Sequence, residues 1–174
     1  MGLQPWILNS RLFYTNRPLS VGLSASPHGE KMKYICEVLL DLPRDRVVEL
    51  FDNTENLSKW QPGLQSFEHL HGDPGQPGAK SRMVFQEGRR RIEMVETITR
   101  RNLPDEFSGT YEAKGVKNWV VNRFVDESGK TRWIAEQEFQ FTGIMKFIAP
   151  FMRGAFPKQT QKYLEQFKAF AESA

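Results

Sequence analysis

The chain has 174 residues, enough for one domain with a substantial core, and 39% of them are hydrophobic, including large flat phenylalanine side chains that can fill or line that core. The 24 basic and 21 acidic residues leave a net charge of +3, too small and too mixed to require nucleic acid as a partner. A lone cysteine, Cys36, excludes an internal disulfide, and no apolar stretch approaches the ~18 residues that span a bilayer, so we expect a cytoplasmic, soluble protein.

The first 31 residues differ in composition from the rest of the chain. Residues 1–29 contain no Asp or Glu, and their first apolar run, residues 6–8, is too short for a secretory signal. We interpret residues 1–31 as a flexible extension or an upstream start preceding Met32. A transit peptide for an organelle is the alternative, because the segment carries Arg and Ser and lacks acids. The single domain is expected over residues 32–172.

The domain opens with a strand and two short helices. Residues 33–42 are mostly apolar and predict a strand. Pro43 follows, where a helix can begin because proline is tolerated at the first helical position. Apolar side chains then recur at helical spacing over residues 44–51, and Asn53 offers a cap for a second short helix over residues 54–60.

Segments separated by turn residues follow at intervals of about a dozen residues, which is typical of an antiparallel meander. The expected strands are residues 64–71, 79–86, 90–100, 106–113, 117–125 and 131–141.

The last of these strands has the clearest alternation. Its polar positions are Arg132, Glu136, Glu138 and Gln140, and its apolar positions are Trp133, Ala135, Phe139 and Phe141. One face is therefore inward and the other is solvated. Gln137 belongs to the inward set, so it needs a hydrogen-bond partner from the protein, a water molecule or a ligand.

After Gly143 the apolar residues no longer recur at every second position but at helical spacing. The apolar stripe consists of Ile144, Phe147, Ile148, Phe151, Met152, Tyr163, Leu164, Phe167 and Phe170. Pro150 and Pro157 should interrupt its first half, because each removes a backbone donor. We expect two segments, with the regular helix starting near Lys158.

This order of elements resembles the helix-grip superfamily (SRPBCC, START-like), which includes START domains, the birch pollen allergen and polyketide cyclases. The resemblance extends over residues 32–172 and is carried by the segments LPRDRV (42–47), ENLSKWQPG (55–63) and YLEQFK (163–168). It is nearest to the bacterial branch that is similar to polyketide cyclases and dehydrases. It implies an α+β fold in which a curved, seven-stranded antiparallel sheet grips a long C-terminal helix around a hydrophobic cavity. Such a cavity suits a lipid, polyketide or aromatic molecule.

The candidate site follows from strand parity and this implied cavity. We expect the ligand-binding residues to be Tyr111, Asn118, Val120, Asn122, Trp133, Ala135, Gln137, Phe139, Phe141, Phe147 and Phe151. Glu96 and Tyr111 are the candidates for a catalytic acid or base, and Glu93 opposes Glu96 in parity, so only one of these two carboxylates can face inward. His69 and His71 share a strand face but lack a third ligand, so neither a metal nor another cofactor is expected.

Three functions remain open at this point. A carrier or sensor is favoured, because no nucleophile has a partnered base. The second is an enzyme of the cyclase or dehydratase kind, in which Glu96 or Tyr111 moves a proton. The third is a module that contacts a protein or a membrane surface through an exposed apolar stretch over residues 147–156. Basic clusters at residues 89–91 and 100–101 would add weak attraction to anionic lipid headgroups.

Overall fold

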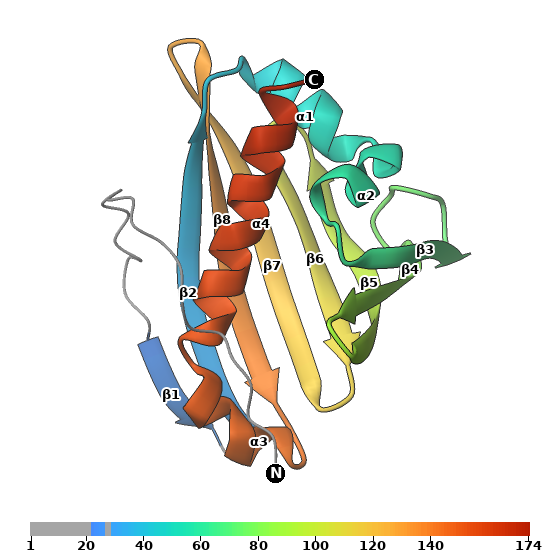
Figure 1. The fold of residues 1–174 in the computed structure, drawn as a ribbon, viewed down its shortest axis with the longest axis vertical. Coiled ribbons are helices and arrows are strands. Elements are labelled where there is room, and N and C mark those ends of the chain that lie inside the picture. The colour runs from blue at the N-terminus through green and yellow to red at the C-terminus, as the bar shows by residue number, and fades with distance from the viewer. Residues whose placement is uncertain (1–21, 27–28) are drawn as a thin grey trace.

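The computed structural model describes the backbone of residues 22–26 and 29–174 and the side chains from Lys31 onward. The strands in this part of the chain are β1 (Gly22–Ser26), β2 (Gly29–Leu40), β3 (Leu64–His71), β4 (Lys80–Glu87), β5 (Arg90–Asn102), β6 (Glu106–Ala113), β7 (Val116–Glu127) and β8 (Lys130–Phe141). They form one antiparallel sheet in the order β1-β2-β8-β7-β6-β5-β4-β3 (Figure 1). The expected α+β helix-grip fold is confirmed, with β1 added at one edge from residues that we had assigned to the extension.

The helices lie between β2 and β3 and after β8. The first group is α1 (Arg44–Asp52), the 3-10 turn η1 (Thr54–Asn56) and α2 (Leu57–Trp60). The second group is α3 (Met145–Ile148), the 3-10 turn η2 (Ala149–Met152) and α4 (Ala155–Ala171). The capping role of Asn53 is confirmed, because its side chain accepts a hydrogen bond from the backbone N–H of Glu55 at 3.0 Å.

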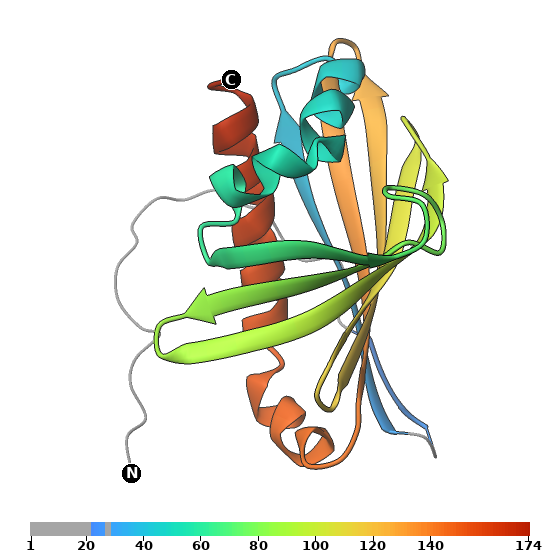
Figure 2. The same ribbon diagram turned by 90° about the vertical axis from the view of Figure 1, so that its right-hand side faces the viewer.

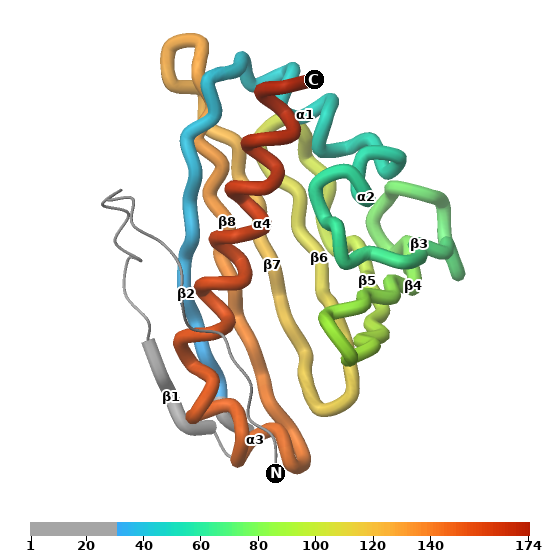
Figure 3. Tube along the Cα trace, viewed as in Figure 1, coloured from blue at the N-terminus to red at the C-terminus, as the bar shows by residue number. Residues whose placement is uncertain are grey.

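The sheet is strongly curved, and α4 lies on its concave side. Figure 1 shows α4 running along β2 and β8, and the trace in Figure 3 follows β2 beside β8 over most of their length. Seen from the side, β3, β4 and β5 swing away from the plane of β7 and β8 toward the side that carries α4 (Figure 2). No helix in the described residues is both long and apolar enough to cross a membrane.

Strand alternation places the core on the concave face. Every second residue of β8 from Thr131 to Phe141 is buried, as the alternation predicted. Opposite residues of an antiparallel pair share a face, so the pairing of Val38 with Trp133, and of Trp133 with Phe124, continues this face into β2 and β7.

Two groups of aromatic rings join the sheet to α4. In the first, Phe167 of α4 packs edge-on against Trp133 at 5.1 Å, Trp60 at 5.3 Å and Phe51 at 6.1 Å between ring centroids. In the second, Phe156 lies 5.0 Å from Phe139 and 5.3 Å from Phe141. Each group buries area that is worth several kcal/mol in transfer free energy, so α4 is fixed at both of its ends.

The C-terminal helix begins earlier than expected. It starts at Ala155 rather than near Lys158, and Pro157 lies within its first turn. The N–H groups of a first turn have no intrahelical acceptor, so proline removes no hydrogen bond there. Pro150 lies in η2, where the chain is already interrupted between α3 and α4.

Candidate ligand-binding site

Polar side chains cross the concave face in one line from β5 to β8. Glu96 pairs with Tyr111, Tyr111 pairs with Asn118, and Gln137 lies on the same face of the next strand, opposite Val120. We call Glu96, Tyr111, Asn118 and Gln137 the inner polar row. The sheet register holds these four residues in place, because directly opposite residues of antiparallel strands have adjacent side chains.

The row is joined by two short hydrogen bonds. The hydroxyl of Tyr111 donates to Oε1 of Glu96 at 2.6 Å, and Nδ2 of Asn118 donates to Oε1 of Gln137 at 2.8 Å. The two catalytic candidates therefore lie together. The inward Gln137 thus has a hydrogen-bond partner within the protein, Asn118. Glu93 faces away from Glu96, and its Oε1 lies 3.3 Å from Nε of Arg82.

Burial shifts the proton affinity of this pair. Desolvation raises the pKa of Glu96, and the hydrogen bond from Tyr111 offsets part of that rise by stabilising the carboxylate. The pKa of Tyr111 is raised well above its usual value by burial and by the nearby charge of Glu96. Tyr111 thus stays a hydrogen-bond donor at physiological pH, while Glu96 holds its proton more readily than an exposed carboxyl.

This environment predicts a pH-dependent loss of stability that Glu96→Gln should remove. The usual pKa of the carboxyl is 4.5, and burial raises it in the folded state. Between pH 4.5 and the raised value, the carboxyl is ionised in the unfolded state but must bind a proton on folding, so the folded state loses stability relative to the unfolded state as pH rises through this window. Glu96→Gln cannot ionise and should gain stability relative to the unchanged protein over this window.

The measurement is the urea midpoint of both proteins at a series of pH values. Glu93→Gln is the matched control on the outer face of the same strand, and it should show no such gain. A constant difference between Glu96→Gln and the unchanged protein at every pH would contradict a buried, titrating Glu96.

The open hydrogen-bonding capacity of the row includes buried oxygen acceptors. Within the described part of the chain, Oδ1 of Asn118 is buried and has no hydrogen-bond partner, which costs about 1–3 kcal/mol in a protein interior. The hydroxyl oxygen of Tyr111 gives its proton to Glu96 and keeps lone pairs that can accept. None of the four residues is cationic, and Arg101, on the inner face at the end of β5, is held by both oxygens of Asp52.

The other predicted inner residues are mostly part of the packed core. Asn122 is buried and accepts a hydrogen bond from Nε1 of Trp133 at 2.9 Å. Val120 and Ala135 are buried between these polar groups, and Phe139 stacks on Phe141 at 5.9 Å. They surround the inner polar row with apolar surface.

Two predicted residues lie elsewhere. Phe147 and Phe151 were expected on the inner face, but they are 66% and 91% exposed on α3 and η2. Helical spacing alone assigned them to the stripe that continues into α4, whereas the break between η2 and α4 turns their side of the short helices outward. These two residues therefore do not contribute to the concave face.

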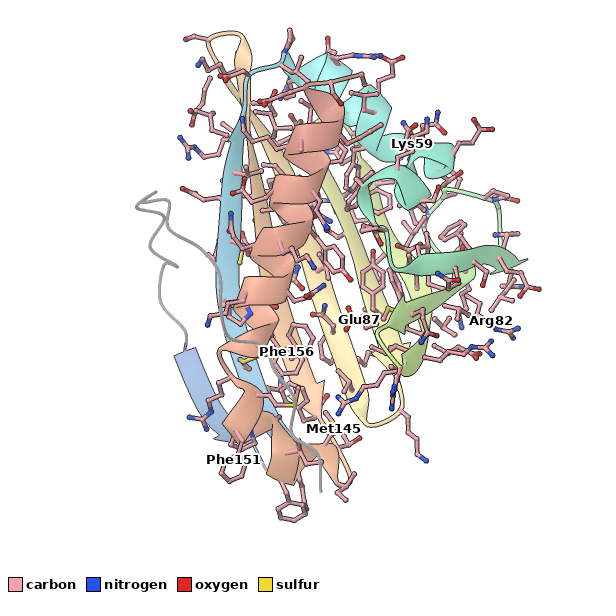
Figure 4. The ribbon with its side chains drawn as sticks, in the orientation of Figure 1. Lys59, Arg82, Glu87, Met145, Phe151 and Phe156 are labelled. Atoms are coloured by element: carbon pink, nitrogen blue, oxygen red, sulfur yellow. The ribbon has the colours of Figure 1, made fainter. Side chains whose placement is uncertain are left out.

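A contact between β4 and α4 is among those that the sequence did not indicate. Glu87, at the end of β4, accepts hydrogen bonds from the hydroxyl of Tyr163 and from Nε2 of Gln159, both at 3.4 Å. Figure 4 shows Glu87 on the side of its strand that faces α4. Glu87 thereby links β4 to α4. Because 76 residues separate Glu87 from Tyr163, no local sequence pattern could predict this contact.

The histidine pair on β3 leads to no metal centre in the described residues, where no group of three or more His, Cys, Asp or Glu side chains is placed to hold an ion. Nε2 of His69 lies 2.8 Å from the carbonyl oxygen of Gly72. A register shift separates His69 from His71, so the two residues do not keep regular strand spacing.

Comparison with known proteins agrees with this architecture. A family model described as polyketide cyclase / dehydrase and lipid transport matches residues 36–172. No curated protein matches the chain by sequence.

Among solved structures, the chain is similar to Ara h 8.0201, with a TM-score of 0.70 and 14% identity over 83% of this chain and 99% of the other. The Zhui aromatase/cyclase from Streptomyces gives a TM-score of 0.70 and 13% identity over 82% of this chain and 94% of the other. A truncated norcoclaurine synthase from Thalictrum flavum gives a TM-score of 0.66 and 11% identity over 84% of this chain and 97% of the other. At such identities the likeness concerns the fold alone.

Proposed function

The chain belongs to the polyketide cyclase/dehydrase and lipid transport family, and we propose that it binds a hydrophobic small molecule between the concave face and α4, as a carrier or sensor. The observation that carries this proposal is the inner polar row, a line of partly paired polar groups enclosed by apolar side chains. Mostly apolar surroundings with a few convergent polar groups are typical of small-molecule sites. We place this activity in the cytoplasm, where the free thiol of Cys36 would stay reduced.

The polarity of the row supports a ligand that donates hydrogen bonds. Tyr111 gives its proton to Glu96 and Asn118 gives one amide proton to Gln137, and the oxygen atoms of both side chains stay open as acceptors. A ligand hydroxyl or N–H would satisfy these acceptors, and each such hydrogen bond contributes about 0.5–1.5 kcal/mol.

The same row disfavours a ligand carboxylate. A carboxylate can only accept hydrogen bonds when ionised, and it would lie near Glu96. Arg101 on the same face is already neutralised by Asp52, so it offers little compensation. We therefore propose a neutral, hydroxyl-bearing lipid, polyketide or aromatic molecule rather than a fatty acid or an aromatic acid.

The first test is native mass spectrometry of the purified full chain, followed by denaturation and identification of any released compound. Titration with a matched series of ligands then tests whether the site prefers a hydrogen-bond donor. The series is a long-chain alcohol, its methyl ether and the carboxylate of equal length. The alcohol should bind about two- to tenfold more tightly than the ether, as expected for one hydrogen bond, and the carboxylate should bind most weakly.

Asn118→Leu should remove most of the preference for the alcohol over the ether, because it deletes one open acceptor. Glu112→Gln, on the outer face of the neighbouring strand, is the matched control and should keep the preference. Tightest binding of the carboxylate would overturn the assigned polarity, and failure of every apolar probe to bind would overturn the carrier proposal itself.

A cyclase or dehydratase activity is the second candidate function, and the hydrogen bond between Tyr111 and Glu96 supports it. A carboxyl with a raised pKa gives and takes a proton closer to neutral pH than an exposed carboxyl does. In this case Glu96→Gln should abolish turnover of a polyketide substrate while leaving its binding intact, whereas unchanged turnover would exclude Glu96 from the mechanism.

A further inference from the structure

The short helices α3 and η2 carry apolar side chains on two opposite faces. Ala149 is 2% exposed and belongs to the core, and Met145 packs against that core beside Gly115. These residues anchor the segment to the sheet, and Figure 4 shows Met145 on the side of α3 that faces the strands. Only this inner face of α3 and η2 therefore packs against the core.

The outer face is a continuous apolar stripe. Ile144, Phe147, Ile148 and Phe151 follow the spacing i, i+3, i+4 and i+7 that places side chains on one side of a helix. Ile144 is 73% exposed, and Phe151 projects from the end of the molecule in Figure 4. We call Ile144, Phe147, Ile148, Phe151 and Met152 the α3 patch. Scattered single apolar residues are ordinary on a surface, but a contiguous group marks an interaction site.

The chain segment that carries the α3 patch has basic residues but no acidic ones. No Asp or Glu occurs in residues 142–164, which contain Lys146, Arg153, Lys158 and Lys162. The ammonium of Lys146 lies 4.8 Å from the centroid of the Phe147 ring, so charge and apolar surface are adjacent. The α3 patch thus combines exposed aromatic rings with basic residues, and its own segment contributes no acidic residue.

We propose that the α3 patch docks the protein on an anionic lipid bilayer. Its aromatic and aliphatic side chains would enter the boundary between headgroups and acyl chains, while lysine side chains remain at the headgroups. Each lysine near an anionic membrane surface strengthens binding by about fivefold. A second copy of the chain fits less well, because two basic patches would repel one another.

The test is flotation of the full chain with vesicles of phosphatidylcholine alone and with vesicles that also contain phosphatidylserine. The protein should float with the anionic vesicles and much less with the neutral ones, and added salt should weaken its binding. Phe147→Ser combined with Phe151→Ser should reduce the bound fraction at least about tenfold. Lys146→Gln should reduce binding to anionic vesicles about fivefold and leave the weak binding to neutral vesicles unchanged.

Leu70→Ser combined with Val125→Ser is the matched control, because these are also exposed apolar residues but lie on β3 and β7. This control should float like the unchanged protein. All variants should keep their unfolding midpoints and their affinity for the alcohol probe, which separates docking from the proposed ligand binding. Equal flotation of the patch variant and the control, or a change in oligomeric state in place of vesicle binding, would overturn the proposal.

Discussion

Phe167→Ala should lower the free energy of unfolding by about 3–5 kcal/mol, the range for truncating a buried phenylalanine. Phe167 has 0% exposure and contacts Phe51, Trp60 and Trp133, so alanine would leave a cavity where α1, α2, α4 and the sheet meet. Rings already packed edge-to-face have little freedom to fill that space. Urea denaturation followed by tryptophan fluorescence should show a lower midpoint with an unchanged slope.

Phe151→Ala provides the matched control for Phe167→Ala. The same atoms are removed from a side chain that is 91% exposed, so stability should change by no more than about 0.5 kcal/mol. Similar losses in the two variants would mean that the outer face of η2 is covered in solution, and a small loss for Phe167→Ala would contradict the aromatic packing around α4.

Gly72→Ala should destabilise the protein by at least twice as much as Gly78→Ala. Both glycines have positive φ, +81° and +92°, where an alanine is disfavoured by about 1–2 kcal/mol. A Cβ at Gly72 would also lie 2.9 Å from Cα of Ala79, a backbone atom that cannot move aside without shifting β4. A Cβ at Gly78 would meet nothing within 4 Å.

The unfolding midpoints of these two variants separate backbone strain from steric overlap, because both substitutions lie in the connection between β3 and β4. We expect a clear loss for Gly72→Ala and a smaller loss for Gly78→Ala. Equal losses would show that the approach of Gly72 to Ala79 is relaxed in solution and that positive φ alone determines both effects.

The strands could be predicted because turn residues and alternation act locally. The predicted limits of β3 and β6 agree with the structure, and both strands are followed by turns that contain a glycine of positive φ, Gly72 and Gly115. The alternation around Trp133 correctly assigned the inner face of β8, because each buried residue there is two positions from the next.

The surroundings of Phe147 and Phe151 could not be predicted from spacing. A helix with apolar residues on two faces gives no indication of which face meets the sheet, and the buried Ala149 contributes a weaker hydrophobic signal than the exposed rings. Only the position of α3 against Gly115 determines the inner side.

The candidate site was predicted in part. Parity correctly separated Glu96 from Glu93, because period two is fixed by the strand itself. The contact between Glu96 and Tyr111, and that between Asn118 and Gln137, depends on the register of neighbouring strands. Register is set across the sheet and includes an irregularity between Ile98 and Arg100, which no single-strand pattern reveals.

The order of the sheet has a consequence for how the chain folds. From β3 to β8 every pair joins consecutive strands, so these hairpins form from nearby residues. In contrast, β2 pairs with β8, and the contact between Lys31 and Glu138 spans 107 residues. Contacts of such separation form slowly, since the intervening chain must first be ordered. During synthesis, the apolar face of β2 therefore stays uncovered until β8 and then α4 emerge from the ribosome, which leaves this segment open to aggregation in the meantime.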